Sequence, residues 1–287
     1  MALELVADYP CETGEGPVWH VDEEALYWVD IPNGLLYRYD PETDEHGLVR
    51  EGNPVGGVTV QADGSLLLFG AGGAVDRWEA ESETATRVAT LGEAADTRFN
   101  DVIADPEGRV FCGTMPTEDR LGALYRLDRD AGFTRVVDEA DIPNGMGFSP
   151  DWETFYFTVS EEETIYAFDY DVETGGLSNR SVFVDTGGEA GVPDGLTVDA
   201  AGDVWSARWN GGVLVRYSPA GEERERIEFP ARKVSSAAFG GRSLDDLYVT
   251  TAGGDGRPDE GELAGSLFRY DPDASGTPAF RSRVGLD

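Results

Sequence analysis

The sequence predicts an all-β fold, a six-bladed β-propeller in which four-stranded antiparallel blades surround a central channel. Three observations predict it: one strand–turn–strand pattern occurs six times, further strand-like segments follow most copies, and no long amphipathic helix is visible. A period of about 40–50 residues with some four strands per unit is typical of propeller blades. We therefore expect a single propeller domain over residues 1–287.

Each copy joins a short apolar strand to a second apolar or aromatic strand through a turn built on Asp, Pro or Gly. Alternation of this kind around a tight turn is typical of a β-hairpin. The copies are VWHVDEEALYWVD from Val18, VTVQADGSLLLFG from Val58, VIADPEGRVFCGT from Val102, MGFSPDWETFYFT from Met146, LTVDAAGDVWSAR from Leu196 and AAFGGRSLDDLYVTT from Ala237.

Additional strands complete the blades. Most copies lead into a further strand with its own turn, as in LLYRYDPET, GALYRLDRDAG, TIYAFDYDVETGG, VLVRYSPAGE and SLFRYDPDASG. The opening segment LELVA, from Leu3, is one more strand. We expect it to pair with the last blade and so to close the ring.

The charge balance is extreme, with 56 Asp and Glu against 22 Lys and Arg and a formal net charge of −34. Such a charge destabilises a compact fold at low salt, whereas molar salt shortens the screening length to about 3 Å. The acids are spread along the whole chain, which predicts a solvated acidic coat of a halophilic protein and argues against a basic partner. The same charge argues against nucleic acid as a ligand.

Other classes are also disfavoured. No run of about 18 apolar residues could span a membrane, and the start MALELVADYP lacks the basic region of a signal peptide, so we expect a cytoplasmic protein. Cys11 and Cys112, with His20 and His46, are too few for a disulfide framework or a zinc cluster. Any metal would be held mainly by oxygen atoms.

Four segments place polar residues where the strand pattern calls for apolar ones. Each lies at the same place in the repeat, immediately before the strand that leads into the turn, so the repeat symmetry directs them to one point on the axis. They are CETGEGPVWH with Glu15, TRFNDV with Arg98, Asn100 and Asp101, PNGMGF with Asn144, and VPDGLTV with Asp194.

Glu15, Asn144 and Asp194 together offer hard oxygen ligands for one divalent cation. Two carboxylates balance its charge, the amide oxygen adds a neutral donor, and oxygen-only ligation suits Ca²⁺, Mg²⁺ or Mn²⁺. Singly, each segment also has an ordinary explanation, because PNG and PDG are common turn sequences and Glu15 and Arg98 could be surface charges. Their equivalent positions in four repeats favour a site.

These segments carry a resemblance to a known family. GEGPVW with YWVDI, RFNDVIADPEGRVFCGTM, PNGMGFSPD and PDGLTVDAAGDVWSA, with a later FGG and LYVTTA, resemble the gluconolactonase/regucalcin (senescence marker protein) family in order, from Glu15 to Phe268. The resemblance implies a sugar lactonase that converts an aldonolactone (xylono-, arabino- or gluconolactone) to the aldonic acid. It also implies one divalent cation in the channel, with calcium favoured and Mg, Mn, Zn or Fe compatible.

The resemblance also assigns roles to single residues. It implies that Glu15, Asn144 and Asp194 are metal ligands and that Asp194 is the candidate general base. Arg98 and Asn100 match substrate-binding positions, and Glu118 falls where some members contact sugar hydroxyls. Two stretches depart from the family pattern: the strand after PNG reads FYFTVS where an aspartate is common, and ARKVSSAA replaces a proline-rich stretch.

A mechanism follows as a hypothesis: the metal polarises the lactone carbonyl, Asp194 or the metal activates a water, and Arg98 and Asn100 hold the hydroxyl groups. Alternatives are a metal-dependent esterase or phosphotriesterase, a non-catalytic calcium-binding propeller, and a receptor-type propeller, although YWVD occurs only once here. A closed propeller has few free edges, and with its acidic coat we expect a monomer.

Overall fold

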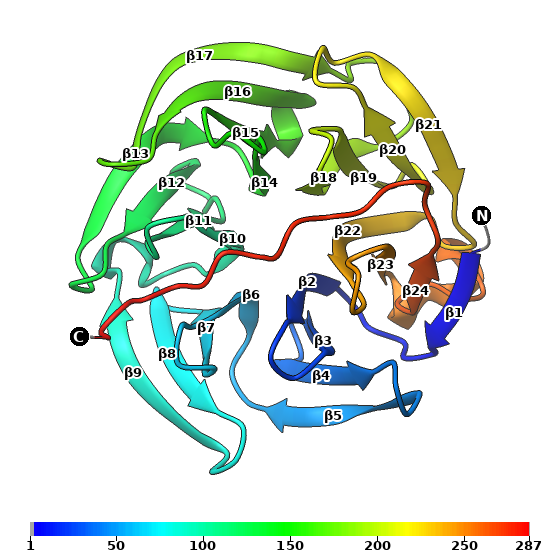
Figure 1. The fold of residues 1–287 in the computed structure, drawn as a ribbon, viewed down its shortest axis with the longest axis horizontal. Helices are drawn as coiled ribbons and strands as arrows, with labels where there is room; N and C mark the ends of the chain where they lie inside the picture. The colour runs from blue at the N-terminus through cyan, green and yellow to red at the C-terminus, as the bar shows by residue number, and fades with distance from the viewer. Residues whose placement is uncertain (1–2, 287) are drawn as a thin grey trace.

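A computed structural model describes residues 3–286 of the chain. Within them, six four-stranded antiparallel sheets are arranged as blades around a central channel (Figure 1). The predicted six-bladed propeller is confirmed. Each sequence repeat supplies the first and second strands of a blade, and the strand-like segments that follow supply the third.

The strands follow one another outward from the channel in blades 1 to 5. Blade 1 contains β2 (Gly14–His20), β3 (Ala25–Asp30), β4 (Leu35–Asp40) and β5 (Glu45–Glu51), and blade 2 contains β6 (Val55–Val60), β7 (Leu66–Gly70), β8 (Ala74–Glu79) and β9 (Thr84–Thr90). Blade 3 contains β10 (Phe99–Ala104), β11 (Val110–Thr114), β12 (Gly122–Leu127) and β13 (Phe133–Ala140), and blade 4 contains β14 (Pro143–Phe148), β15 (Thr154–Val159), β16 (Thr164–Asp171) and β17 (Gly176–Asp185). Blade 5 contains β18 (Val192–Val198), β19 (Val204–Trp209), β20 (Val213–Tyr217) and β21 (Glu223–Glu228).

Blade 6 joins the two ends of the chain. Its inner strands are β22 (Lys233–Gly240), β23 (Asp246–Ala252) and β24 (Leu267–Tyr270), and its outermost strand is β1 (Leu3–Ala7). β1 pairs antiparallel with β24, with Leu5 opposite Phe268. The prediction that LELVA closes the ring is therefore confirmed.

Helical structure in the described part of the chain is limited to short pieces: η1 (Gly92–Ala94), η2 (Ser160–Glu162), η3 (Gly254–Gly256) and α1 (Arg257–Glu260). The expected lack of long helices is confirmed for this part. None of these helices is long and apolar enough to span a membrane.

The core is divided among the interfaces between blades. Buried apolar side chains of the described residues form six clusters, and each cluster joins two neighbouring blades. Phe69 of blade 2 meets Phe99 of blade 3 edge to face, with ring centroids 5.5 Å apart, and Trp205 of blade 5 meets Phe239 of blade 6 in the same way at 6.1 Å. Radial repetition thus buries both faces of every sheet.

The chain after β24 forms a strap, residues 271–286, across one end of the channel (Figure 1). It contacts every blade: the Gly276 N–H donates to Leu244 O (2.7 Å) and the Ser282 N–H to Val60 O (2.9 Å). Further contacts are Ala200 N–H to Ser275 O and Arg283 N–H to Gly108 O, the Arg281–Asp22 ion pair, and Phe280 against Phe148.

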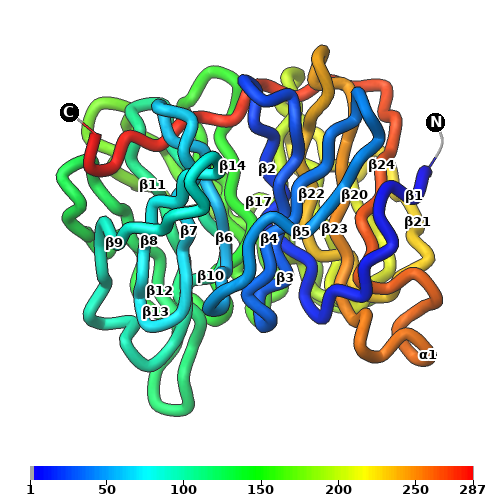
Figure 2. Tube along the Cα trace, turned by 90° about the horizontal axis from the view of Figure 1, so that it is seen from below, coloured from blue at the N-terminus to red at the C-terminus, as the bar shows by residue number. Residues whose placement is uncertain are grey.

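The two ends of the channel therefore differ. The strap covers the end where the inner strands finish, and α1 lies at the opposite end, where they begin (Figure 2). We call this second end the mouth. Because all four polar segments lie at or next to the starts of inner strands, they belong to the mouth.

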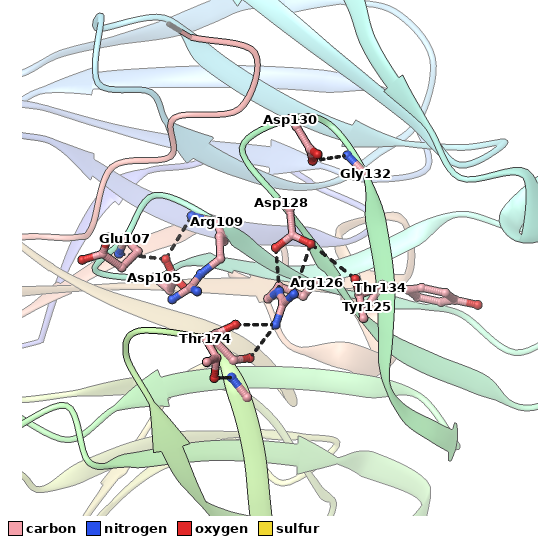
Figure 3. A network of polar contacts seen from close by, with 12 residues as sticks. Asp105, Glu107, Arg109, Tyr125, Arg126, Asp128, Asp130, Gly132, Thr134 and Thr174 are labelled. Atoms are coloured by element: carbon pink, nitrogen blue, oxygen red, sulfur yellow. Dashed lines mark hydrogen bonds and ion pairs between the residues drawn. The ribbon is translucent and has the colours of Figure 1, made fainter.

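Arginines from blade 3 also hold blade 4 through the turn between β16 and β17 (Figure 3). Buried Arg109 pairs with buried Asp105 (Nε–Oδ2, 2.5 Å) and donates to the carbonyls of Val172 (2.6 Å) and Glu173 (3.1 Å). Beside it, Arg126 donates to the carbonyl of Thr174 at 2.8 Å. We call this set the blade 3–4 clamp.

Candidate functional site

A β-bulge occurs at the same height in every inner strand of the described propeller. In each, the register with the second strand shifts within the first residues: between Glu15/Val18, Val55/Gly57, Phe99/Val102, Pro143/Met146, Pro193/Leu196 and Val234/Ser236. A bulge re-aims side chains and is frequent beside active sites. The predicted polar residues lie in or directly before these bulges, which explains how strand residues can turn towards one channel position.

The glycines after Asn144 and Asp194 permit close contact between neighbouring inner strands. A Cβ on Gly145 would lie 2.6 Å from the Asp194 carbonyl oxygen, and one on Gly195 would lie 2.8 Å from the Ser235 carbonyl oxygen. PNG and PDG lie within β14 and β18. The alternative that they are turns is wrong; the glycines there provide space between blades.

Gly145→Ala should therefore destabilise the fold by about 1–3 kcal/mol, because the new methyl group meets rigid backbone. It should also lower turnover by displacing Asn144 and Asp194. Urea unfolding at molar KCl measures the first effect. Gly47→Ala is the matched control, since a Cβ there meets nothing within 4 Å; equal stability of the two variants would contradict the close-contact explanation.

Hydrogen bonds connect three predicted residues from three blades. Asn100 Nδ2 donates to Asn144 Oδ1 (3.1 Å) and to the Pro143 carbonyl (3.0 Å). Asn144 Nδ2 in turn donates to Asp194 Oδ1 and to Ser160 Oγ (3.0 Å). Asn100, Asn144 and Asp194 are all buried. The network fixes the Asn144 side chain, with its amide nitrogen against the Asp194 carboxylate and its amide oxygen against Asn100.

Arg98 and Glu15 adjoin this network. Arg98 Nη1 donates to Asn100 Oδ1 at 2.8 Å, and Glu15 Oε2 accepts the Gly16 N–H at 2.9 Å. Burial lowers the pKa of Arg98 although Glu15, Asp101 and Asp194 act against this shift. Because a guanidinium keeps its charge in proteins, Arg98 is the positive group among these acids.

Burial and mutual repulsion perturb the carboxylates. Burial, followed by the charges of Asp194 and Asp101, raises the pKa of Glu15 well above its ordinary value. Burial and then Asp101 raise the pKa of Asp194 likewise, and burial raises that of Asp101 to about 7. These carboxylates are close enough to repel one another and outnumber their one cationic neighbour, Arg98. We call Glu15, Arg98, Asp101 and Asp194 the charge cluster.

The donor set fits a divalent cation. When Glu15, Asp101 and Asp194 are ionised, they and Arg98 leave a surplus of two negative charges in a buried space. Among the described residues, no group of three or more His, Cys, Asp and Glu side chains is arranged to hold a metal. A cation at this point would therefore need the Asn144 amide oxygen beside two carboxylates.

Glu118 is not part of the cluster. It is exposed on the loop between β11 and β12, which lies at the mouth because Thr114 pairs with Phe99. No hydrogen bond or ion pair joins it to Arg98 or Asn100. Its predicted contact with sugar hydroxyls stays a prediction.

Sequence reasoning assigned no role to three polar residues in or beside the charge cluster. Ser160, at the departure FYFTVS, accepts the hydrogen bond from Asn144 and donates to the Pro193 carbonyl at 2.7 Å, so it links β14 to β18. Asp101 lies in the same bulge as Asn100. The two adjacent polar residues in TRFNDV were the sequence feature that could have indicated a role for Asp101. Ser235, at the other departure, donates to the Gly14 carbonyl at 2.6 Å beneath Glu15.

The cysteines and histidines of the chain are not among the residues of the charge cluster. Cys11 and Cys112 are free and buried, as expected, and burial raises the pKa of Cys11 to about 12. His20 contacts the Gly64 carbonyl at 3.0 Å, and His46 contacts the Tyr9 hydroxyl at 2.9 Å; neither of these contacts involves the charge cluster.

A cavity of about 190 Å³ lies in the other half of the channel, between the cluster and the strap. Asp101 lines its inner end and Phe280 its strap end. Asp101 thus lies where this cavity meets the cluster.

Comparison with known proteins assigns the family. A sequence profile described as SMP-30/Gluconolactonase/LRE-like region matches residues 13–253. The chain belongs to the SMP-30/gluconolactonase family. It is 52% identical to the pentonolactonase XacC of Haloferax volcanii over 294 residues, which cover 100% of both chains. It is 36% identical to human regucalcin over 281 residues, which cover 93% of each chain.

Solved structures show the same family fold. A calcium-binding regucalcin from Agrobacterium tumefaciens superposes with a TM-score of 0.92 at 24% identity, covering 99% of this chain and 98% of the other. A gluconolactonase from Xanthomonas campestris gives a TM-score of 0.75 at 23% identity, covering 93% and 88%. At these identities the likeness concerns the fold alone.

Proposed function

We propose that the protein is a sugar lactonase that hydrolyses a five-carbon aldonolactone, such as a xylono- or arabinonolactone, to the aldonic acid. The observation that carries this proposal is the 52% identity over full length to a pentonolactonase of a Haloferax species. The net charge of −34 is consistent with function at high salt. The buried charge cluster at the mouth supports hydrolysis at this point.

Each residue of the site can have a separate role in lactone hydrolysis. Asp194 would accept a proton from the attacking water at its carboxylate, and its raised pKa brings it closer to the working range of a general base. Asn144 holds that carboxylate in place by a hydrogen bond. Arg98 and Asn100 would bind the lactone hydroxyls, with Glu118 reaching them from its loop, and so fix the ester bond against the water.

We further propose that Glu15, Asn144 and Asp194 hold one divalent cation, with calcium favoured by the oxygen-only donor set. A bound cation of this kind supplies Lewis-acid polarisation of the ester carbonyl and stabilises negative charge on its oxygen. The surplus of two negative charges supports this assignment.

Acid release from D-xylono-1,4-lactone and D-glucono-1,5-lactone at molar KCl tests the function. The protein is measured after chelation and again with Ca²⁺, Mg²⁺ or Mn²⁺ restored, with spontaneous hydrolysis subtracted. We expect cation-dependent acceleration with the five-carbon lactone preferred. Folded protein that accelerates neither reaction with any cation would overturn the proposal and favour another ester substrate or a binding role.

A further inference from the structure

We propose that Lys233, Glu260 and Trp209 form a second sugar-binding subsite at the mouth, on the side away from Arg98. This inference rests on the proposed lactonase function and deepens it, because it states where the hydroxyl groups on the far side of the lactone are held. The three residues come from three separate segments, and none of them belongs to the charge cluster.

Lys233 lies at the mouth, beside the strands that carry the two predicted carboxylate ligands. It is the first residue of β22 and pairs with Ala252, which also bridges Thr13 just before β2. Blade 6 stands in the ring between blade 5, which carries Asp194, and blade 1, which carries Glu15. The position therefore borders the opening above the charge cluster.

The three side chains contact one another directly. Lys233 Nζ lies 2.9 Å from Glu260 Oε1 and 5.2 Å from the centroid of the Trp209 ring. Glu260 ends α1, and its carbonyl accepts the Arg232 N–H at 2.7 Å, which fixes the loop at the mouth. Trp209 pairs with Val192, so it stands beside the first residues of β18.

One atom of this group lacks a partner. Glu260 Oε2 is buried and has no hydrogen-bond donor within the described part of the chain. A buried carboxylate oxygen in this state is unusual in a folded protein and calls for a donor. An ion pair through Oε1 alone leaves this oxygen unexplained. The side chains of Lys233 and Glu260 are 22% and 17% exposed, and a rotation of the carboxylate would bring Oε2 to a sugar hydroxyl at the mouth.

The chemistry of the other two residues also suits a sugar. Lys233 is the only lysine among the 22 basic residues, and its ammonium has three rotatable donors that can turn towards a hydroxyl without losing Glu260. Trp209 is partly exposed, and the part of its ring that Lys233 does not cover would contact the C–H side of a sugar. Donor, acceptor and apolar surface are together what a hydroxylated lactone requires.

The subsite complements the predicted one across the mouth. Arg98 and Asn100 belong to blade 3, which lies opposite blade 6 in a ring of six. A lactone with its ester bond above the charge cluster would thus have polar protein groups on both sides. Held from both sides, it would have its orientation fixed during hydrolysis.

The test compares Lys233→Met and Glu260→Gln with the wild type on D-xylono-1,4-lactone. γ-Butyrolactone, which has the ester but no hydroxyls, serves as a competitive inhibitor. We expect Lys233→Met to raise KM about tenfold or more, as for loss of a charged hydrogen bond, with kcat and the butyrolactone inhibition constant little changed. Glu260→Gln should raise KM less, because its amide oxygen still accepts.

Arg232→Met is the matched control, since it removes one positive charge from an exposed neighbouring side chain; its KM should equal that of the wild type. Suppose that the wild type is active, but Lys233→Met leaves KM unchanged or changes KM and the butyrolactone inhibition constant by the same factor. This result would overturn the subsite and leave the proposed function standing. A folded wild type that hydrolyses no lactone would overturn the proposed function and the subsite with it.

Discussion

Asp194→Asn should reduce lactone turnover by about 10²–10⁴-fold, the range expected when a general base is removed. It should also weaken cation binding, because one of two predicted carboxylate ligands becomes an amide. The fold should survive, since the substitution removes a buried charge that Asp101 repels. Turnover at saturating lactone, calorimetric cation titration and thermal unfolding in chelator measure the three effects.

Asp119→Asn provides the control for this prediction. It removes the same charge from an exposed position on the loop between β11 and β12, at the same end of the channel, and should leave turnover unchanged. If Asp194→Asn kept wild-type turnover and cation affinity while folded, the assignment of base and ligand would be wrong. If both variants lost activity equally, the cause would be the general negative field and not the site.

Arg109→Met should destabilise the protein by about 3–5 kcal/mol, as expected when one partner of a buried ion pair is removed. The change leaves the Asp105 carboxylate buried without its cation and deletes the bonds to Val172 and Glu173 that hold blade 4. Because the pair is buried, molar salt screens it little, and the loss should persist at high KCl. Urea unfolding measures it.

Arg242→Ala is the comparison, because Arg242 forms exposed ion pairs with Glu24 and Glu42. At molar KCl its unfolding midpoint should match that of the wild type. Adding Asp105→Asn to Arg109→Met should recover part of the loss, since no unpaired charge then stays buried. If Arg109→Met unfolded at the same urea concentration as Arg242→Ala, the clamp would contribute nothing.

Repetition made the fold predictable. Six hairpins with turns at equivalent places predict six blades, and the unpaired opening segment LELVA predicts ring closure, because every strand in a propeller needs a neighbour. The same symmetry predicted that Glu15, Asn100, Asn144 and Asp194 share one end of the channel. These predictions rest on the local strand–turn–strand pattern and on the equivalence of positions among the six repeats.

Contacts specific to one blade could not be predicted in this way. Ser160, directly after β15, accepts from Asn144 and donates to the Pro193 carbonyl, a pair of contacts that no repeat signals. The sequence patterns PNG and PDG are typical of turns, which suggests that Gly145 and Gly195 are turn residues. The structure shows instead that a Cβ at either position would collide with the neighbouring inner strand. The ion pair of Lys233 depends on a loop 27 residues further along the chain, with no repeat to mark it.

The strap has a consequence for the order of assembly. During synthesis β1 is made before the five complete blades and its partner β24 after them, so the edge of β1 stays open while those blades are made. Residues 275–283, which fasten the blades to one another, follow later still. Fastening of the blades by the strap therefore comes after ring closure, and a nascent chain halted before β24 would carry an open strand edge, which favours aggregation.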